Sequence, residues 1–267
     1  MATEKQLQDY RDQGYFIADD AVDAAMLEVL EAAARRVREK VRSGAVDIKS
    51  SRSESGEPQV IWGLMAPEFA EPVFAAYLIS KPLMAYVRAM LGEELRLGAV
   101  SIFCNANQAP YDTGWHRDLG GEERDSSAAV ELEILGRFRK YHRKWHLALA
   151  DDPCLWLVPG SHRRYRTERE REAMIDNPYA DIPGQRRISL QRGQTLFWSG
   201  NGIHRGRAPE ELDERLSLVA HLDQYREGEP RMEKDDRFAW LLAENVRGAL
   251  PEQLQLYYDR WRALQQV

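Results

Sequence analysis

The sequence predicts a mainly β protein, in which a barrel or double sheet of short strands is flanked by helices. The middle of the chain carries short apolar or alternating runs that Gly, Pro, Asn and Asp separate. This pattern is typical of barrels and sandwiches. Apolar residues at helical spacing dominate residues 1–92 and return in the tail from Asp236, which predicts the flanking helices.

Residues 1–92 are predicted to be helical. An apolar stripe with spacings of three and four indicates one long helix face: Leu27, Leu30, Ala34, Val37 and Val41. Asp23 suits the start of this helix and Gly44 suits its end. Ser80 and Gly92 bound a second predicted helix, as its N-cap and its left-handed terminator.

The predicted core of short strands covers about residues 95–225. Strands are expected at 95–103, 145–150, 154–158, 188–190, 195–198 and 216–222. Turn-forming residues lie between them, as a barrel or double sheet requires. Helices are predicted again for about 236–267, and no internal repeat or change of composition marks a second domain. We therefore expect one domain over residues 1–267.

Composition and charge exclude several classes of partner. The chain has 267 residues, a formal net charge of −6 and a pI of about 5.6, which gives no electrostatic reason to bind nucleic acid or an anionic membrane. Cys104 and Cys154 are the two cysteines, and they have no metal-ligand spacing. The N-terminus lacks a signal-peptide pattern, and no apolar run approaches the roughly 18 residues of a membrane span. We expect a cytoplasmic protein without a membrane partner, and nothing predicts its oligomeric state.

The central chemical signal is a His-x-Asp motif, His116 and Asp118, followed much later by His204. Residues two apart in an extended segment face the same side, so His116 and Asp118 can reach one metal ion. His204 would complete the set from a distant strand. Two imidazoles and one carboxylate leave the opposite metal positions open, as expected for Fe(II) oxygenases. The motif alone also occurs in polar surface turns.

Arg215 adds specificity to this motif. It lies eleven residues after His204 at the head of an apolar strand, with Ser217 on the same face. A guanidinium can hold a carboxylate through two parallel hydrogen bonds, and a buried unpaired guanidinium is costly. A dicarboxylate that chelates the metal and meets Arg215 at its far end would satisfy both. The alternative is an exposed Arg215 paired with Glu214 or Asp213.

Several stretches together resemble the phytanoyl-CoA dioxygenase family of Fe(II)/2-oxoglutarate oxygenases. They are Gly-Trp-His-Arg-Asp (114–118), Trp-His-Leu-Ala-Leu-Ala-Asp-Asp (145–152), Leu-Val-Pro-Gly-Ser-His (157–162), and then His204 with Arg215 beyond it. The resemblance implies a double-stranded β-helix, a cupin-like jelly-roll, flanked by helices. It implies that His116, Asp118 and His204 are catalytic iron ligands, and that Arg215 binds the distal carboxylate of 2-oxoglutarate.

The resemblance also implies a reaction. Fe(II), 2-oxoglutarate and O2 would hydroxylate an unactivated C–H bond of a small molecule, releasing succinate and CO2. Asp118 argues against halogenation, because related halogenases replace this carboxylate with a small residue. Substrate identity, and hydroxylation as opposed to desaturation, epimerisation or cyclisation, are not predicted. The alternatives are a zinc-dependent hydrolase with the same residues and an inactive jelly-roll that only binds a ligand.

Three further residues are candidates for binding the co-substrate. Lys144 and His146 share one face of a predicted strand. If that face is the interior, both can contact co-substrate or substrate; in the opposite register they face solvent and Trp145 packs inside. Asn105, at the end of the strand before His116, is either a hydrogen-bond donor to the co-substrate or a strand-terminating turn residue.

A basic run covers residues 137–144 in this acidic chain. It is too short for the broad basic surface expected of a nucleic-acid-binding protein. Two interpretations stay open. The run either selects an anionic substrate, or it forms a solvated loop that pairs with Glu131, Glu133 and the acidic stretch 122–125.

Overall fold

Two antiparallel sheets form the centre of the molecule in the computed structural model, which describes residues 1–105, 111–118, 125–138, 142–232 and 235–265. The larger sheet has the order β1-β8-β5-β10-β4-β3-β2, and the smaller has the order β7-β6-β9. The strands are β1 (Tyr15–Ala18), β2 (Ser50–Arg52), β3 (Pro58–Trp62), β4 (Leu95–Asn105), β5 (His142–Ala148), β6 (Asp152–Leu157), β7 (Arg186–Leu190), β8 (Thr195–Trp198), β9 (His204–Gly206) and β10 (Arg215–Gln224). The prediction of a mainly β protein with flanking helices is confirmed.

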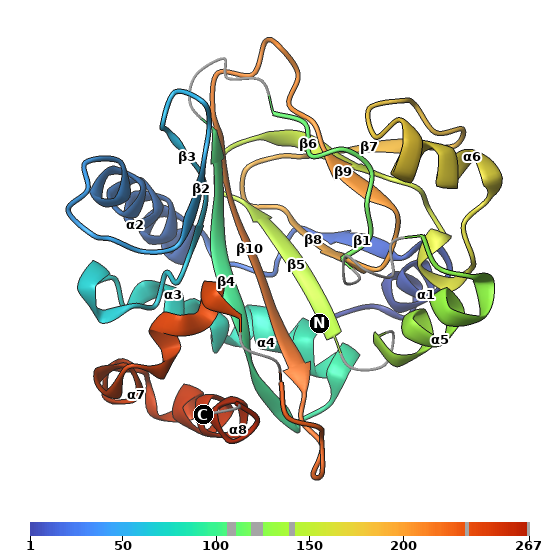
Figure 1. The fold of residues 1–267 in the computed structure, drawn as a ribbon. Coiled ribbons are helices and arrows are strands. Elements are labelled where there is room, and N and C mark those ends of the chain that lie inside the picture. The colour runs from blue at the N-terminus through green and yellow to red at the C-terminus, as the bar shows by residue number, and fades with distance from the viewer. Residues whose placement is uncertain (106–110, 119–124, 139–141, 233–234, 266–267) are drawn as a thin grey trace.

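Helices gather on both flanks of the sheets (Figure 1). The α-helices are α1 (Glu4–Gln13), α2 (Ala24–Arg42), α3 (Val73–Leu78), α4 (Lys81–Leu91), α5 (Ala128–Phe138), α6 (Glu168–Arg171), α7 (Glu244–Ala249) and α8 (Glu252–Ala263). Short helical turns are η1 (Pro67–Phe69), η3 (Ser161–Arg163), η4 (Glu172–Asp176) and η5 (Asp236–Leu242). Helix α2 packs on β3, α4 packs on β5 and β10, and α8 packs on β4. Among the described residues, no helix is both long and apolar enough to cross a membrane.

The two helices predicted near the N-terminus form at the expected places. The whole apolar stripe of α2 is buried, and Asp23 caps this helix by accepting a hydrogen bond of 2.7 Å from the Met26 amide. Ser80 and Gly92 bound α4 at the predicted places, but Ser80 makes no side-chain cap hydrogen bond and Gly92, at φ 82° and ψ −168°, is not in the predicted left-handed helical conformation. A helical N-terminal part over residues 1–92 is nevertheless an incomplete prediction, since β1, β2 and β3 also lie there. These strands have only three to five residues each, and β1 and β2 are the edge strands of the sheet, so they give little alternation to detect.

The central strands of the larger sheet are buried on both faces, and their side chains alternate between two environments. Leu216 and Leu218 of β10, with Trp145 and Leu147 of β5, join the apolar core under the helices. Because alternate residues of a strand face opposite sides, Arg215 and Ser217, like Lys144 and His146, face the other side, toward the smaller sheet. The fold therefore directs the candidate polar residues of both strands into one interior space.

Candidate metal centre

The structure brings His116, Asp118 and His204 together. One potential ligand atom from each residue lies within 4.8 Å of the others. His204 Nε2 is 3.7 Å from Asp118 Oδ1, and His116 Nε2 is 4.0 Å from the same oxygen. Two segments far apart in the sequence thus converge as predicted, with donors of the kind that binds a divalent metal ion.

A short antiparallel bridge fixes this convergence. The His116 amide donates to the His204 carbonyl at 2.9 Å, and the His204 amide donates back at 3.0 Å. Two residues further, the Asp118 amide donates to the Gly200 carbonyl at 2.9 Å. A Cβ atom on Gly200 would lie 2.1 Å from Asp118 Oδ2. This close approach favours glycine at position 200. Sequence reasoning did not identify this need, although Gly200 lies only four residues before His204.

Both imidazoles are held in the tautomer that a metal ligand needs. His116 Nδ1 lies 2.9 Å from the Gly114 carbonyl, and His204 Nδ1 lies 2.9 Å from the Gly202 carbonyl. A carbonyl can only accept, so Nδ1 carries the proton and the lone pair of Nε2 faces the cluster. Burial, together with the neighbouring His116, lowers the pKa of His204 to about 3, which keeps this ring neutral.

Lys144 faces the interior and contacts the carboxylate of the cluster. Its Nζ donates to Asp118 Oδ2 at 2.8 Å and lies 4.8 Å from the centre of the Trp198 ring. Oδ1 of Asp118 is therefore the oxygen left for a metal. Burial would raise the pKa of Asp118, but the Lys144 ammonium outweighs it, so this pKa lies below its ordinary value. The inward register of β5 is correct, and Trp145 is buried as well, on the opposite face.

Arg215 is buried and is paired within the protein. It is 2% exposed, so the exposed strand-end alternative is wrong, and Glu214 pairs instead with two arginines of α2. The sequence did not predict that a carboxylate of the chain itself lies beside it. Arg215 Nε donates to Asp152 Oδ2 at 3.0 Å, and the same oxygen accepts from Ser217 Oγ at 2.6 Å and from His146 Nε2 at 2.8 Å.

Asp152 is thus a residue of this region that sequence reasoning missed. In the sequence it is the last residue of the stretch 145–152, and nothing there predicts that it is buried, with only 2% of its surface exposed. Two aromatic rings border the guanidinium, with centres 4.9 Å (Tyr111) and 5.3 Å (Phe103) from its carbon. Asn105 pairs with Arg215 through the backbone ladder, and its side chain lies outside the part that the structure describes.

Strand β5 connects the two groups. Lys144 contacts Asp118, and His146, on the same face, contacts Asp152. Two residues of an extended strand span roughly 7 Å. The Arg215 group therefore lies about that far along the strand behind the metal-ligand cluster, on the same interior side.

The back of the His-x-Asp segment is held by buried charges. Arg117 is 3.1 Å from Glu131 Oε1 on α5 and also donates to the Ser161 carbonyl at 2.8 Å. Arg166 approaches the other oxygen of Glu131 at 3.3 Å. The described partners of Glu131 are thus two arginines that lie outside the basic run 137–144. Most side chains of that run, residues 137–142, lie outside the described residues.

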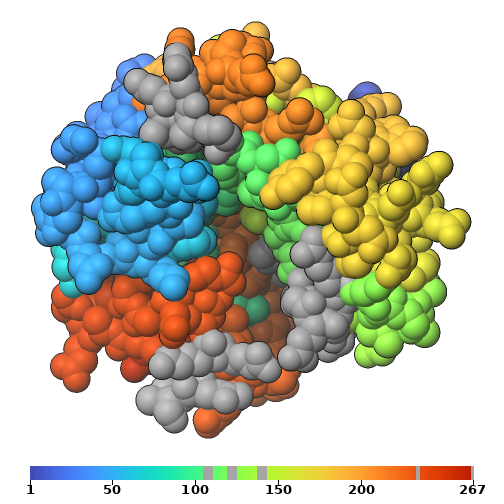
Figure 2. Space-filling view, turned by 45° about the horizontal axis from the view of Figure 1, so that its top comes forward, coloured from blue at the N-terminus to red at the C-terminus, as the bar shows by residue number. Residues whose placement is uncertain are grey.

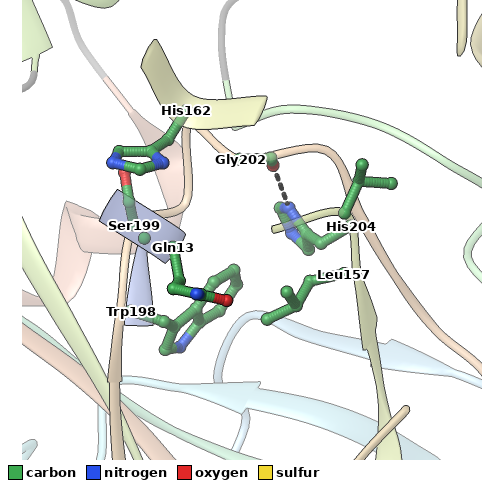
Figure 3. Close-up of a pocket in the computed structure, with 9 residues that line it drawn as sticks. Gln13, Leu157, His162, Trp198, Ser199, Gly202 and His204 are labelled. Atoms are coloured by element: carbon green, nitrogen blue, oxygen red, sulfur yellow. Dashed lines mark hydrogen bonds between the residues drawn. The ribbon is translucent and has the colours of Figure 1, made fainter. Parts of the chain in front are cut away.

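A small pocket adjoins the cluster. It is partly open and is lined by His204, Trp198, Leu157, His162 and Gln13 among others. Figure 3 shows the His204 ring at one end of this pocket and His162 at the other. Figure 2 shows that one face of the molecule is hollowed between the blue β2–β3 region, the red C-terminal part and the yellow and green region around α5 and α6.

Comparisons with known proteins agree with this architecture. A family model described as phytanoyl-CoA dioxygenase (PhyH) matches residues 10–210. No curated protein matches the sequence. EctD from S. alaskensis with bound Fe has a TM-score of 0.65 at 18% identity, over 88% of this chain and 80% of that one. HygX from Streptomyces hygroscopicus with nickel and 2-oxoglutarate bound has a TM-score of 0.59 at 19% identity, over 85% and 90%. The predicted jelly-roll core is confirmed.

Proposed function

Because the chain belongs to the phytanoyl-CoA dioxygenase family, we propose that it is an Fe(II)- and 2-oxoglutarate-dependent oxygenase. Its substrate would be a small molecule with an unactivated C–H bond, which is hydroxylated with release of succinate and CO2. The observation that carries the proposal is the cluster of His116, Asp118 and His204, whose ligand atoms lie within 4.8 Å of one another.

The donor set fits a ferrous ion. Two neutral imidazoles present Nε2 and one carboxylate presents Oδ1, since Lys144 takes the other carboxylate oxygen. Three such donors leave further metal positions for a co-substrate and dioxygen. When bound there, iron supplies the activation of dioxygen and the oxidation of the C–H bond. The backbone carbonyls of Gly114 and Gly202 keep the ligand tautomers fixed, and Lys144 holds the orientation of the carboxylate.

The region behind the cluster fits 2-oxoglutarate. Arg215 uses Nε for Asp152, which leaves its terminal amino groups for the distal carboxylate of a co-substrate. One 2-oxoglutarate molecule would then span both groups, with its distal carboxylate at Arg215 and its keto acid end at the metal. HygX, with nickel and 2-oxoglutarate bound, and EctD, with 2-oxoglutarate and 5-hydroxyectoine, share the fold and lend support.

The test is succinate formation that depends on both added Fe(II) and 2-oxoglutarate. His116→Ala and His204→Ala should abolish it, because each removes a metal ligand. Arg215→Ala should raise the KM for 2-oxoglutarate at least tenfold, about the effect of losing one charge-assisted pair. Arg207→Ala is the control, since this arginine is half-exposed and lies outside the site.

Two outcomes would contradict the proposal. One is full activity of the Arg215 variant at unchanged KM. The other is metal-dependent hydrolysis with no succinate, which would indicate the zinc hydrolase instead. Metal content alone does not separate these, because such a site binds zinc more tightly than Fe(II).

A further inference from the structure

Asp152 accepts hydrogen bonds from the two side chains that were expected to bind the co-substrate. Arg215 Nε and Ser217 Oγ both donate to its Oδ2, at 3.0 and 2.6 Å. The three residues are between 0 and 2% exposed. A carboxylate of the protein itself therefore lies against the guanidinium whose terminal amino groups a dicarboxylate would use.

The carboxylate of Asp152 is fully engaged. Oδ2 also accepts from His146 Nε2 at 2.8 Å, and Oδ1 accepts from the Cys154 amide at 2.8 Å. Although burial would raise it, the pKa of Asp152 lies well below its ordinary value because Arg215 and His146 are close. Burial lowers the pKa of His146, so that ring is neutral. The group thus carries one positive and one negative charge.

A second carboxylate at Arg215 would change this balance. Two anions would then share one buried guanidinium, and like charges at such short range repel strongly where water is scarce. The hydrogen bonds of Asp152 hold it in place, so it is not free to move away from an incoming anion. Binding of the co-substrate must work against this repulsion.

We propose that Asp152 is the internal counter-ion of Arg215 and that its charge limits the affinity of the site for the distal carboxylate of 2-oxoglutarate. This inference rests on the proposed function, because it concerns how that co-substrate is held. Asp152 is thus a residue that sets co-substrate affinity through Arg215, without contacting the reacting atoms.

The decisive variant is Asp152→Asn, which removes the charge and keeps the shape. Its carbonyl oxygen can still accept from Arg215 and Ser217. Its amino group would face the Cys154 amide, but that cost is the same with and without co-substrate. Calorimetric titration of the anaerobic Fe(II)-loaded protein should show the Kd for 2-oxoglutarate falling about tenfold. Asp151→Asn is the matched control, because Asp151 is exposed and accepts only from the Arg192 amide among the bonds of the described residues, at 2.8 Å.

The outcomes separate the two proposals. An unchanged or higher Kd in Asp152→Asn overturns the role of Asp152, while the proposed function stands if the wild type binds 2-oxoglutarate. Failure of the Fe(II)-loaded wild type to bind 2-oxoglutarate overturns the proposed function instead.

A measurement on the wild type alone covers the case in which Asp152→Asn does not fold. The 5-methyl ester of 2-oxoglutarate keeps the chelating end and loses the distal charge. If Asp152 already neutralises Arg215, the wild type should prefer 2-oxoglutarate over this ester by less than about a hundredfold. A larger preference would show that Arg215 acts as an uncompensated cation, and the proposal would be wrong.

Discussion

Gly200 shows how a single residue sets the geometry of the candidate metal centre. Its φ lies outside the left-handed region, so alanine is compatible with the backbone there. The obstacle is steric, because a Cβ would lie 2.1 Å from Asp118 Oδ2. Asp118 has little room to yield, since Lys144 and the backbone bond to Gly200 both hold it.

Gly200→Ala should therefore displace the Asp118 carboxylate and weaken metal binding at least tenfold, a typical effect of disturbing a ligand's support. Anaerobic titration with Fe(II) measures this directly. Gly248→Ala is the control: a Cβ there has nothing within 4 Å, so metal affinity should not change. Equal metal affinity of the two variants would contradict the steric argument.

The residues that a spacing rule can find were found from the sequence, and the others were not. His116, Asp118, His204 and Arg215 stand at recognisable intervals. Asp152 lacks such an interval, because its contacts with Arg215 and Ser217 come from the packing of the smaller sheet, which contains β6, against β10. Contacts between buried neighbours depend on how strands pair, which a single sequence does not state.

At the scale of elements, helix α5 supports the His-x-Asp segment through Glu131. This carboxylate is 2% exposed and lies between Arg117 and Arg166. Glu131→Gln would leave both buried guanidinium groups without that charge. Loss of one partner of a buried ion pair costs about 3 kcal/mol or more.

We expect Glu131→Gln to lower the free energy of unfolding by about 3 kcal/mol in urea denaturation. Glu133→Gln, on the exposed side of the same helix, should change it by no more than about 0.5 kcal/mol. Similar losses in both variants would mean that the buried pairing does not stabilise α5 against the His-x-Asp segment.

Elements differ in how well the sequence predicts them. The stripes of α2 and α4 are long enough to mark their buried faces. Strands β1, β2 and β3 were missed because three to five residues show little periodicity. Their positions are set by backbone hydrogen bonds to the neighbouring strands.

For the whole molecule, a bound metal would join segments that are remote in sequence. His116 and Asp118 precede β5, whereas His204 begins β9. A ligand that binds only the folded state stabilises it, by about 2.7 kcal/mol at a hundredfold excess over Kd. Fe(II) should therefore raise the Tm of the wild type in anaerobic thermal unfolding, and chelation should reverse this. His116→Ala should show no such shift; an equal shift in that variant would place the metal elsewhere.

The burial of β10 on both faces has one more consequence. Between Arg215 and Leu222, its even-numbered residues are leucines and an alanine that pack under the helices, and its odd-numbered residues include Arg215 and Ser217. A slip of one residue would push a guanidinium into hydrocarbon and turn leucines toward the candidate metal-ligand cluster. Alternate positions of one strand thus stabilise the fold and line the candidate site. Substitutions on the polar side can then change the site while the helices keep the leucine surface against which they pack.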